Sequence, residues 1–126
     1  MNSKGYSSAI VFGGAFALYL AFLCPALYNG DSPLLSASAF ALGPAHPPGY
    51  PLYVMLGKAM TFLPAGSVAF KMNVLSALAG AAAAALVYMS VKVLTEDEAA
   101  SVFAALLSAC APLAWAESTK AEVYTL

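Results

Sequence analysis

Three long and mostly apolar runs without charged residues recur along the chain. They cover residues 9–28, 72–91 and 99–116 and contain 20, 20 and 18 residues. A helix needs about 20 apolar residues to cross the ~30 Å hydrocarbon core of a bilayer, and about 17–25 are tolerated. In lipid a helix also satisfies its own backbone hydrogen bonds. The pattern therefore predicts three membrane-spanning helices, at about residues 9–28, 72–93 and 99–116.

A fourth uncharged stretch, residues 32–57, has a different pattern because five of the chain's eight prolines interrupt it. Proline removes a backbone donor and restricts the residue before it to extended geometry. Short helices are predicted at about residues 34–42 and 52–63, with an irregular segment that includes residues 46–51 between them. Neither helix is long enough to cross a membrane. Residues 29–71 are therefore predicted to form a re-entrant or interfacial loop that carries two short helices.

The composition indicates an all-α membrane protein and argues against several other classes. Hydrophobic residues make up 62% of the 126-residue chain, charged residues make up 9%, arginine is absent, and the mean hydropathy is +0.81. Soluble domains contain about 25% charged residues, so a soluble helical bundle is the less favoured alternative. Disordered chains are poor in apolar residues. A net charge of −1 without a basic patch argues against nucleic-acid binding.

The two cysteines and the first apolar run each allow two interpretations. Cys24 and Cys110 lie within apolar runs and are interpreted as small hydrophobic residues, in preference to a disulfide or a metal-binding pair. Residues 9–28, preceded by Lys4, also resemble a secretory signal peptide. However, this run is longer than the usual apolar core of about 7–15 residues, and no small-x-small cleavage site follows it.

Three spans determine which segments share a side of the membrane. The loop over residues 29–71 and the segment after Ala116 lie on one side, and the N-terminus and residues 92–98 lie on the other. A bias in flanking lysines sets the orientation of many membrane proteins. Here the bias decides nothing, because two lysines oppose three: Lys4 and Lys92 on one side, and Lys58, Lys71 and Lys120 on the other.

This topology brings five ionisable residues to one side, close to where the helices leave the membrane: Asp31, His46, Glu117, Lys120 and Glu122. Taken singly, each is explained as an interfacial residue at the end of a span. Their convergence is typical of a substrate or ion path, because ionisable groups near a membrane are costly. The carboxylates could act as a general base, as ligands of a divalent metal ion, or as stabilisers of positive charge.

Aromatic residues lie near these groups along the chain: Tyr50, Tyr53, Trp115 and Tyr124. Aromatic side chains at this depth usually form the interfacial belt of a membrane protein. They also suit stacking on a sugar or contact with a prenyl chain. The sequence contains no Walker loop, no dinucleotide-binding glycine pattern, no Cys/His zinc spacing and no G-x-S-x-G motif, so none of these chemistries is indicated.

Three segments occur in an order and spacing that resemble a known family. They are residues 28–33 (Tyr-Asn-Gly-Asp-Ser-Pro), 45–53 (Ala-His-Pro-Pro-Gly-Tyr-Pro-Leu-Tyr) and 121–126 (Ala-Glu-Val-Tyr-Thr-Leu). From about residue 10, the chain resembles the amino-terminal part of a family of multi-span membrane proteins, formerly a domain of unknown function, that is related to protein O-mannosyltransferases. The resemblance extends to the GT-C superfamily of membrane glycosyltransferases.

The resemblance implies transfer of a hexose, such as mannose, from a polyprenyl-phosphate-linked donor to an acceptor hydroxyl on a protein or a glycan. It implies that Asp31, in the first loop after the first span, is catalytic. It also implies substrate-binding roles for residues near Asp31 or after the third span: His46, Tyr50, Glu117, Lys120, Glu122 and Tyr124. No cofactor is certain, and a divalent metal ion is a candidate.

The resemblance further implies a location and a wider structure. Residues 1–126 would form the N-terminal part of one multi-span membrane domain, with a cytoplasmic N-terminus and the loop over residues 29–71 outside. The fragment would be inactive without its remaining transmembrane helices. The membrane would be the plasma (inner) membrane in a bacterium and the endoplasmic reticulum in a eukaryote. The competing interpretation is a non-enzymatic helical segment of a transporter or membrane assembly protein, which explains the spans but not the gathered polar residues.

Overall fold

The computed structural model describes residues 3–125, and helices are the only regular secondary structure in that range. They are α1 (Ser3–Ala21), α2 (Ser32–Ala41), α3 (Pro51–Thr61), α4 (Val68–Thr95), α5 (Glu98–Cys110) and α6 (Pro112–Ser118). The prediction of an all-α fold is confirmed for this part of the chain. Leu126, the last residue of the third family segment, lies outside the described residues.

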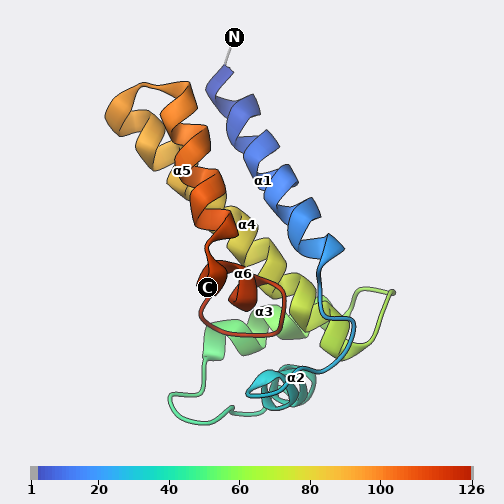
Figure 1. Ribbon diagram of the computed structural model, residues 1–126. Helices are drawn as coiled ribbons and strands as arrows, with labels where there is room; N and C mark the ends of the chain where they lie inside the picture. Colours follow the sequence, from blue (N-terminus) through green and yellow to red (C-terminus); the bar gives the residue numbers. More distant parts are fainter. Residues whose placement is uncertain (1–2, 126) are drawn as a thin grey trace.

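The long helix α4 is the central element of the structure. It packs against each of the other helices in the described range. In Figure 1, α1 and α5 run antiparallel to α4 along one half of its length, and α2 and α3 lie around the end where α4 begins. The segment that contains α6 lies between these two groups of helices. The loops before α2 and after α6 are therefore brought to the same end of α4.

Small residues on α4 allow its neighbours to approach closely. Ala77 and Ala81 are fully buried and form a core with Tyr19 of α1. A Cβ added at Gly80 would lie 3.2 Å from the Tyr19 ring and would overlap the side chain of Ser118. The alanine-rich stretch thus serves close helix packing, which is the kind of packing that holds membrane helices together.

The first predicted span differs from the structure at its C-terminal end. Helix α1 ends at Ala21, whereas the apolar run continues to Tyr28. Pro25 explains the early end, because it has no N–H group to donate and disfavours helical geometry at Cys24. The residues after α1 form instead a non-helical loop that leads to Asp31.

The third predicted span is interrupted. Helix α5 ends at Cys110, Ala111 adopts ψ 134°, and Pro112 begins α6. The residue before a proline is restricted to extended geometry, so a continuous helix over residues 99–116 is disfavoured. The helix predicted over residues 99–116 is thus divided into α5 and α6, which are bent by 64° relative to each other.

Among residues 3–125, α4 is the one helix that is long and apolar enough to cross a membrane without a break. The bent pair of α5 and α6 meets the same criterion when it is taken as one span. The apolar part of α1, Tyr6–Ala21, is shorter than the 18 residues taken as the minimum for a span. The second predicted span, residues 72–93, thus lies within α4, and the third is represented by a broken helix.

The two short helices predicted within residues 29–71 are present as α2 and α3. Their observed bounds lie within two residues of the predicted ones at each end. A core shared with α4, which includes Leu35 and Tyr53, holds both helices against the end of α4. This packing fixes the loops on either side of α2, and those loops carry Asp31 and His46.

Candidate active site

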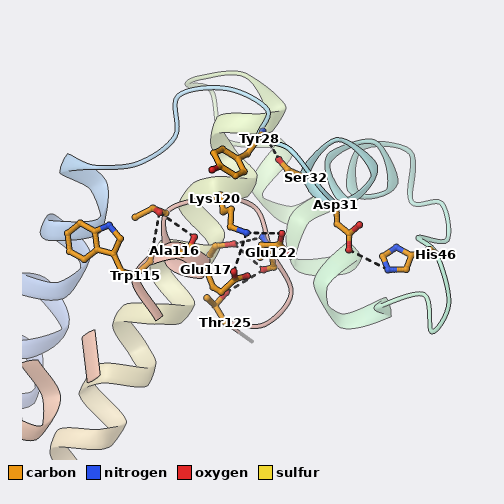
Figure 2. A network of polar contacts seen from close by, with 12 residues as sticks. Tyr28, Asp31, Ser32, His46, Trp115, Ala116, Glu117, Lys120, Glu122 and Thr125 are labelled. Carbon is orange, nitrogen blue, oxygen red and sulfur yellow. Dashed lines mark hydrogen bonds and ion pairs between the residues drawn. The ribbon is translucent and has the colours of Figure 1, made fainter. Parts of the chain in front are cut away.

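Asp31 and His46 face each other at one edge of the site (Figure 2). Asp31 immediately precedes α2, and His46 lies in the loop between α2 and α3. The His46 Nε2 atom lies 3.5 Å from Asp31 Oδ2, and the two side chains are 39% and 43% exposed. The His46 ring also meets the Tyr50 ring edge-on, with 5.4 Å between their centroids. A carboxylate and an imidazole are thus held together where solvent or a substrate can reach them.

Lys120 is the centre of a second polar group, which we call the glutamate–lysine triad: Glu117, Lys120 and Glu122. The Lys120 Nζ atom lies 3.2 Å from Glu117 Oε1 and 3.1 Å from Glu122 Oε1. The exposed fractions of these side chains are only 18%, 15% and 8% for Lys120, Glu117 and Glu122. Burial lowers the pKa of Lys120, but the hydrogen bonds and charges of the two glutamates outweigh burial and raise this pKa. The amine is therefore protonated, and the triad has a formal charge of −1.

The two polar groups are adjacent, although they are far apart in the sequence (Figure 2). A Cβ added at Gly30 would lie 3.8 Å from Glu122 Oε1, so the chain just before Asp31 passes beside the triad. The Lys120 Nζ atom also lies 5.6 Å from the centre of the Tyr28 ring, which is within the range of a cation–π contact. The loop before α2 and the segment after α6 thus meet at one site.

Tyr124 does not join the pair formed by Asp31 and His46. It is 78% exposed and lines, together with Glu117, a mostly apolar cavity of about 500 Å³ next to α4, α5 and α6. Glu117 Oε2 is buried and has no hydrogen-bond partner within the described part of the chain. Glu117 therefore links the triad to this cavity.

The site does not fit a metal ion held by this chain alone. Within residues 3–125, no group of three or more His, Cys, Asp or Glu side chains is placed to hold a metal. Asp31 and His46 offer two ligand atoms, whereas one oxygen of each triad glutamate is paired with Lys120. A divalent ion such as Mg²⁺ is often held by one or two carboxylates together with water and substrate phosphates, so a complete metal site would need ligands from outside this chain. The mechanism derived below routes no step through a metal.

Tyr53 of α3 lies beneath the site and is only 2% exposed. Burial raises the pKa of the Tyr53 hydroxyl to about 12; the nearby hydroxyl of Ser76 opposes this shift, and the charge of Glu122 adds to it. The hydroxyl is therefore protonated at neutral pH. Tyr53 is a packed core residue, and its ring is not available to stack on a sugar.

We expect the folded chain to lose stability above pH 10, and the Tyr53→Phe variant to lose less. A pKa raised from 10 to about 12 by folding gives stability that is complete below pH 10 and is lost as the pH rises to about 12. The parent should therefore lose on the order of 2 kcal/mol more stability than Tyr53→Phe over this pH range. The raised pKa of Lys120 acts in the same direction in both proteins. Thermal unfolding in detergent between about pH 8 and 12 measures the effect, and equal losses in both proteins would contradict it.

Two buried residues of α4, Asn73 and Ser76, were not expected at the site from the sequence. Both are fully buried and form hydrogen bonds with the segments that carry site residues. A signal was present in the sequence, since the two polar residues stand three positions apart in an apolar run and so share a helix face. Tyr28, whose ring lies beside Lys120, was noted only as part of a family segment.

The fold and the site define an all-helical, strongly apolar module whose polar side chains gather beside one end of its central helix. The chain belongs to the family described as the protein O-mannosyl-transferase TMEM260 N-terminal domain, whose profile matches residues 31–126. The matched range begins at Asp31 and includes every candidate site residue predicted from the sequence. The family resemblance of the three sequence segments is thereby confirmed.

Two curated relatives support the same assignment. The protein O-mannosyl-transferase TMEM260 of Mus musculus is 40% identical over 120 residues, which cover 94% of this chain and 17% of the relative. The protein O-mannosyl-transferase tmem260 of Dictyostelium discoideum is 28% identical over 120 residues, which cover 93% of this chain and 15% of the relative. The chain therefore corresponds to a small part of each relative's length. No solved structure matches the chain.

Proposed function

We propose that the full-length protein containing this chain is a membrane glycosyltransferase of the GT-C type. It would transfer a hexose, such as mannose, from a polyprenyl-phosphate donor to an acceptor hydroxyl, including those of protein serine and threonine. The relatives are named protein O-mannosyl-transferases. One structural observation supports this function above all: the loop that carries Asp31, which is paired with His46, passes beside the glutamate–lysine triad at one end of the apolar helix α4.

The protein would cross the membrane three times within this chain, at about residues 9–28, 72–93 and 99–116. The length and composition of α4 support the second span, and the bent pair of α5 and α6 supports the third. The packing of the apolar helix α1 along α4 supports the first. With three spans, the loop that carries Asp31 and the segment that carries Lys120 leave the membrane on the same side, which agrees with their contact.

Residues 1–126 would then be the N-terminal part of one multi-span domain. The complete protein would be a multi-pass integral membrane protein, in the plasma (inner) membrane of a bacterium or the endoplasmic reticulum of a eukaryote. Its partners would be the lipid-linked donor, a protein or glycan acceptor, the surrounding lipid and the remaining transmembrane helices. The low charge of the chain, 9% of its residues, agrees with contacts to lipid or other helices over much of its surface.

Asp31 is the group best placed to take the proton of the acceptor. Its side chain is 43% exposed, so an acceptor hydroxyl can reach it, and His46 orients one of its oxygens. As the acceptor oxygen attacks the anomeric carbon, its proton moves to Asp31, and the bond between that carbon and the donor phosphate oxygen breaks. His46 would keep Asp31 in place during this step through its Nε2 atom, since its other ring nitrogen, Nδ1, is buried.

The glutamate–lysine triad suits a sugar better than a phosphate. The charge of Lys120 is already balanced by two carboxylates, and the remaining negative charge repels phosphate. Carboxylates stabilise the oxocarbenium-like charge that develops at the anomeric carbon in glycosyl transfer, and they accept hydrogen bonds from sugar hydroxyls. Because the chain has no arginine, further cationic groups for the phosphate would come from outside residues 1–126.

Tyr50 and Tyr124 complete the proposed substrate-binding set. Tyr50 lies against His46, where its ring can pack on the donor sugar. Tyr124 lies at the cavity of about 500 Å³, whose apolar lining suits the prenyl chain of the donor. The two tyrosines would thus contact opposite ends of one lipid-linked sugar.

A transfer assay tests this function. The full-length protein is reconstituted into liposomes with radiolabelled polyprenyl-phosphate mannose and a peptide rich in serine and threonine. We expect label in the peptide that mild alkaline elimination releases, and no direct transfer from nucleotide-linked mannose. If correctly folded and inserted protein transfers no hexose from any lipid-linked donor, the enzymatic function is wrong and the non-enzymatic membrane segment is favoured.

A further inference from the structure

Two fully buried polar side chains lie on one face of α4, at the end beside the candidate site. They are Asn73 and Ser76, both 0% exposed and three residues apart. Burying an amide or a hydroxyl in an apolar helix costs free energy unless hydrogen bonds compensate it. Neither residue favours the interior of a helix by intrinsic propensity. Their partners therefore show what the two residues do in this fold.

Asn73 holds the loop that leads to Asp31. Its Nδ2 atom donates to the backbone carbonyl of Cys24 at 2.6 Å and to that of Ala26 at 3.0 Å. The Cys24 N–H in turn donates to the carbonyl of Thr119, at 2.9 Å. This loop is not helical, so its carbonyls have no helical donors, and the Asn73 amide supplies two of the missing hydrogen bonds. The loop before Asp31 is thereby fastened to α4 and to the end of α6.

Ser76 holds the backbone at Glu122 in a similar way. Its Oγ atom accepts from the Glu122 N–H and donates to the Glu122 carbonyl, both at 3.2 Å. The segment around Glu122 follows α6 and is also non-helical. One hydroxyl thus satisfies both backbone groups of the residue whose carboxylate is bound to Lys120. The Glu122 carboxylate and the chain before Asp31 are consequently held against one rigid helix.

We propose that Asn73 and Ser76 are positioning residues that set the separation between Asp31 and the glutamate–lysine triad. Each acts through the backbone of a neighbouring segment, and neither touches the substrate. Without these two residues, the loops would be held to each other by the hydrogen bond between Cys24 and Thr119 and by the contact of Lys120 with the Tyr28 ring, but not to α4 at these points. The inference rests on the proposed function for its catalytic part, whereas its geometric part concerns the fold alone. The same two residues also explain why an otherwise apolar helix carries polar side chains at this end.

The first arm of the test measures kinetics of the full-length protein in liposomes. Asn73→Leu and Ser76→Ala remove the hydrogen bonds, Ser76→Thr keeps the hydroxyl, and Ser90→Ala changes an exposed serine of the same helix that contacts no site segment. We expect kcat to fall by up to about 100-fold in the first two variants, because small displacements of reacting groups have effects of this size. The KM for the donor should change by less than about threefold, since direct contacts with the substrate are kept. Ser76→Thr should restore most of kcat, and Ser90→Ala should match the parent.

The second arm measures geometry without activity. Thr119→Cys is introduced into full-length protein that keeps Cys24 and in which Cys110 and the other cysteines are replaced. Residues that share a backbone hydrogen bond lie close enough for a disulfide, so mild oxidation should link Cys24 to the new cysteine. Asn73→Leu should slow this reaction by about tenfold, because the released loop moves away from α6. Ser90→Ala should leave the rate unchanged.

The outcomes of the two arms are distinguishable. A folded Asn73→Leu protein with an unchanged crosslinking rate would overturn the positioning role. So would a folded Ser76→Ala protein whose kcat equals that of Ser90→Ala, or a donor KM that rises while kcat stays constant. If the parent protein transfers no sugar, the proposed function fails, and the crosslinking rates alone then decide whether Asn73 holds the loop. Ser76→Ala, which removes only one oxygen atom, covers the case in which Asn73→Leu does not fold.

Discussion

Replacing Asp31 by Asn in the full-length protein is expected to lower the rate of sugar transfer by at least about 100-fold, since a general base typically contributes 10²–10⁴-fold. Asparagine keeps the size and shape of the side chain but cannot take a proton from the acceptor. The Asp31 side chain makes no capping hydrogen bond to α2, so that helix loses no such bond. The contact with His46 is partly exposed, and even exposed ion pairs contribute only about 0–1 kcal/mol. Folding should therefore be nearly unchanged.

The measurement is the initial rate of transfer from a labelled lipid-linked donor, together with the thermal stability of the purified protein. Asp97→Asn is the matched control, because Asp97 caps α5 at the far end of α4 and takes no part in the site. Asparagine is also a good N-cap, so this variant should retain both activity and stability. Transfer at the parental rate by the Asp31→Asn protein would remove Asp31 from the mechanism.

Replacing Lys120 by Met is expected to be the most destabilising single change at the site. It leaves the carboxylates of Glu117 and Glu122 close together, mostly buried and without their cation. Removing one partner of a buried ion pair costs about 3 kcal/mol or more, because an uncompensated charge stays in a poorly solvated place. Thermal or chemical unfolding of the chain in detergent measures the loss.

A triple variant separates stability from catalysis. Glu117→Gln, Lys120→Met and Glu122→Gln together remove all three charges while they keep similar volumes, so most of the lost stability should return. Sugar transfer should stay low in the triple variant, since the carboxylates proposed to face the sugar are gone. A single Lys120→Met variant as stable as the parent would contradict the ionic account of the triad. A fully active triple variant would show that the triad has no part in transfer.

The sequence predicted those parts of the fold that depend on local chain chemistry. The apolar run over residues 72–91 predicted the central helix, because no charge or proline interrupts it. The prolines between residues 33 and 51 predicted two short helices and the irregular segment that separates them. The same reasoning applied to Pro25 and Pro112 would have predicted the early end of α1 and the break before α6, since the residue before each proline is restricted in the same way.

The grouping of site residues could be predicted only in outline. Counting three spans places Asp31 and Lys120 on the same side of the membrane, and the structure brings their two segments together (Figure 2). The counting does not give the pairing within each group. His46 pairs with Asp31 because the core between α2, α3 and α4 fixes both loops, and Lys120 pairs with two glutamates because the segment after α6 folds back against α4.

By itself, the sequence of this protein determined its class: eleven charges in 126 residues, gathered between long apolar runs, specify an apolar all-helical chain with polar loops. Hydrophobic length and proline positions act locally, so they can be interpreted without the fold. Only the tertiary structure decided the role of Asn73 and Ser76 and the balance of charge around Lys120. Those features depend on hydrogen bonds and ion pairs between segments distant in sequence, and they exist only once α4 has brought the segments together.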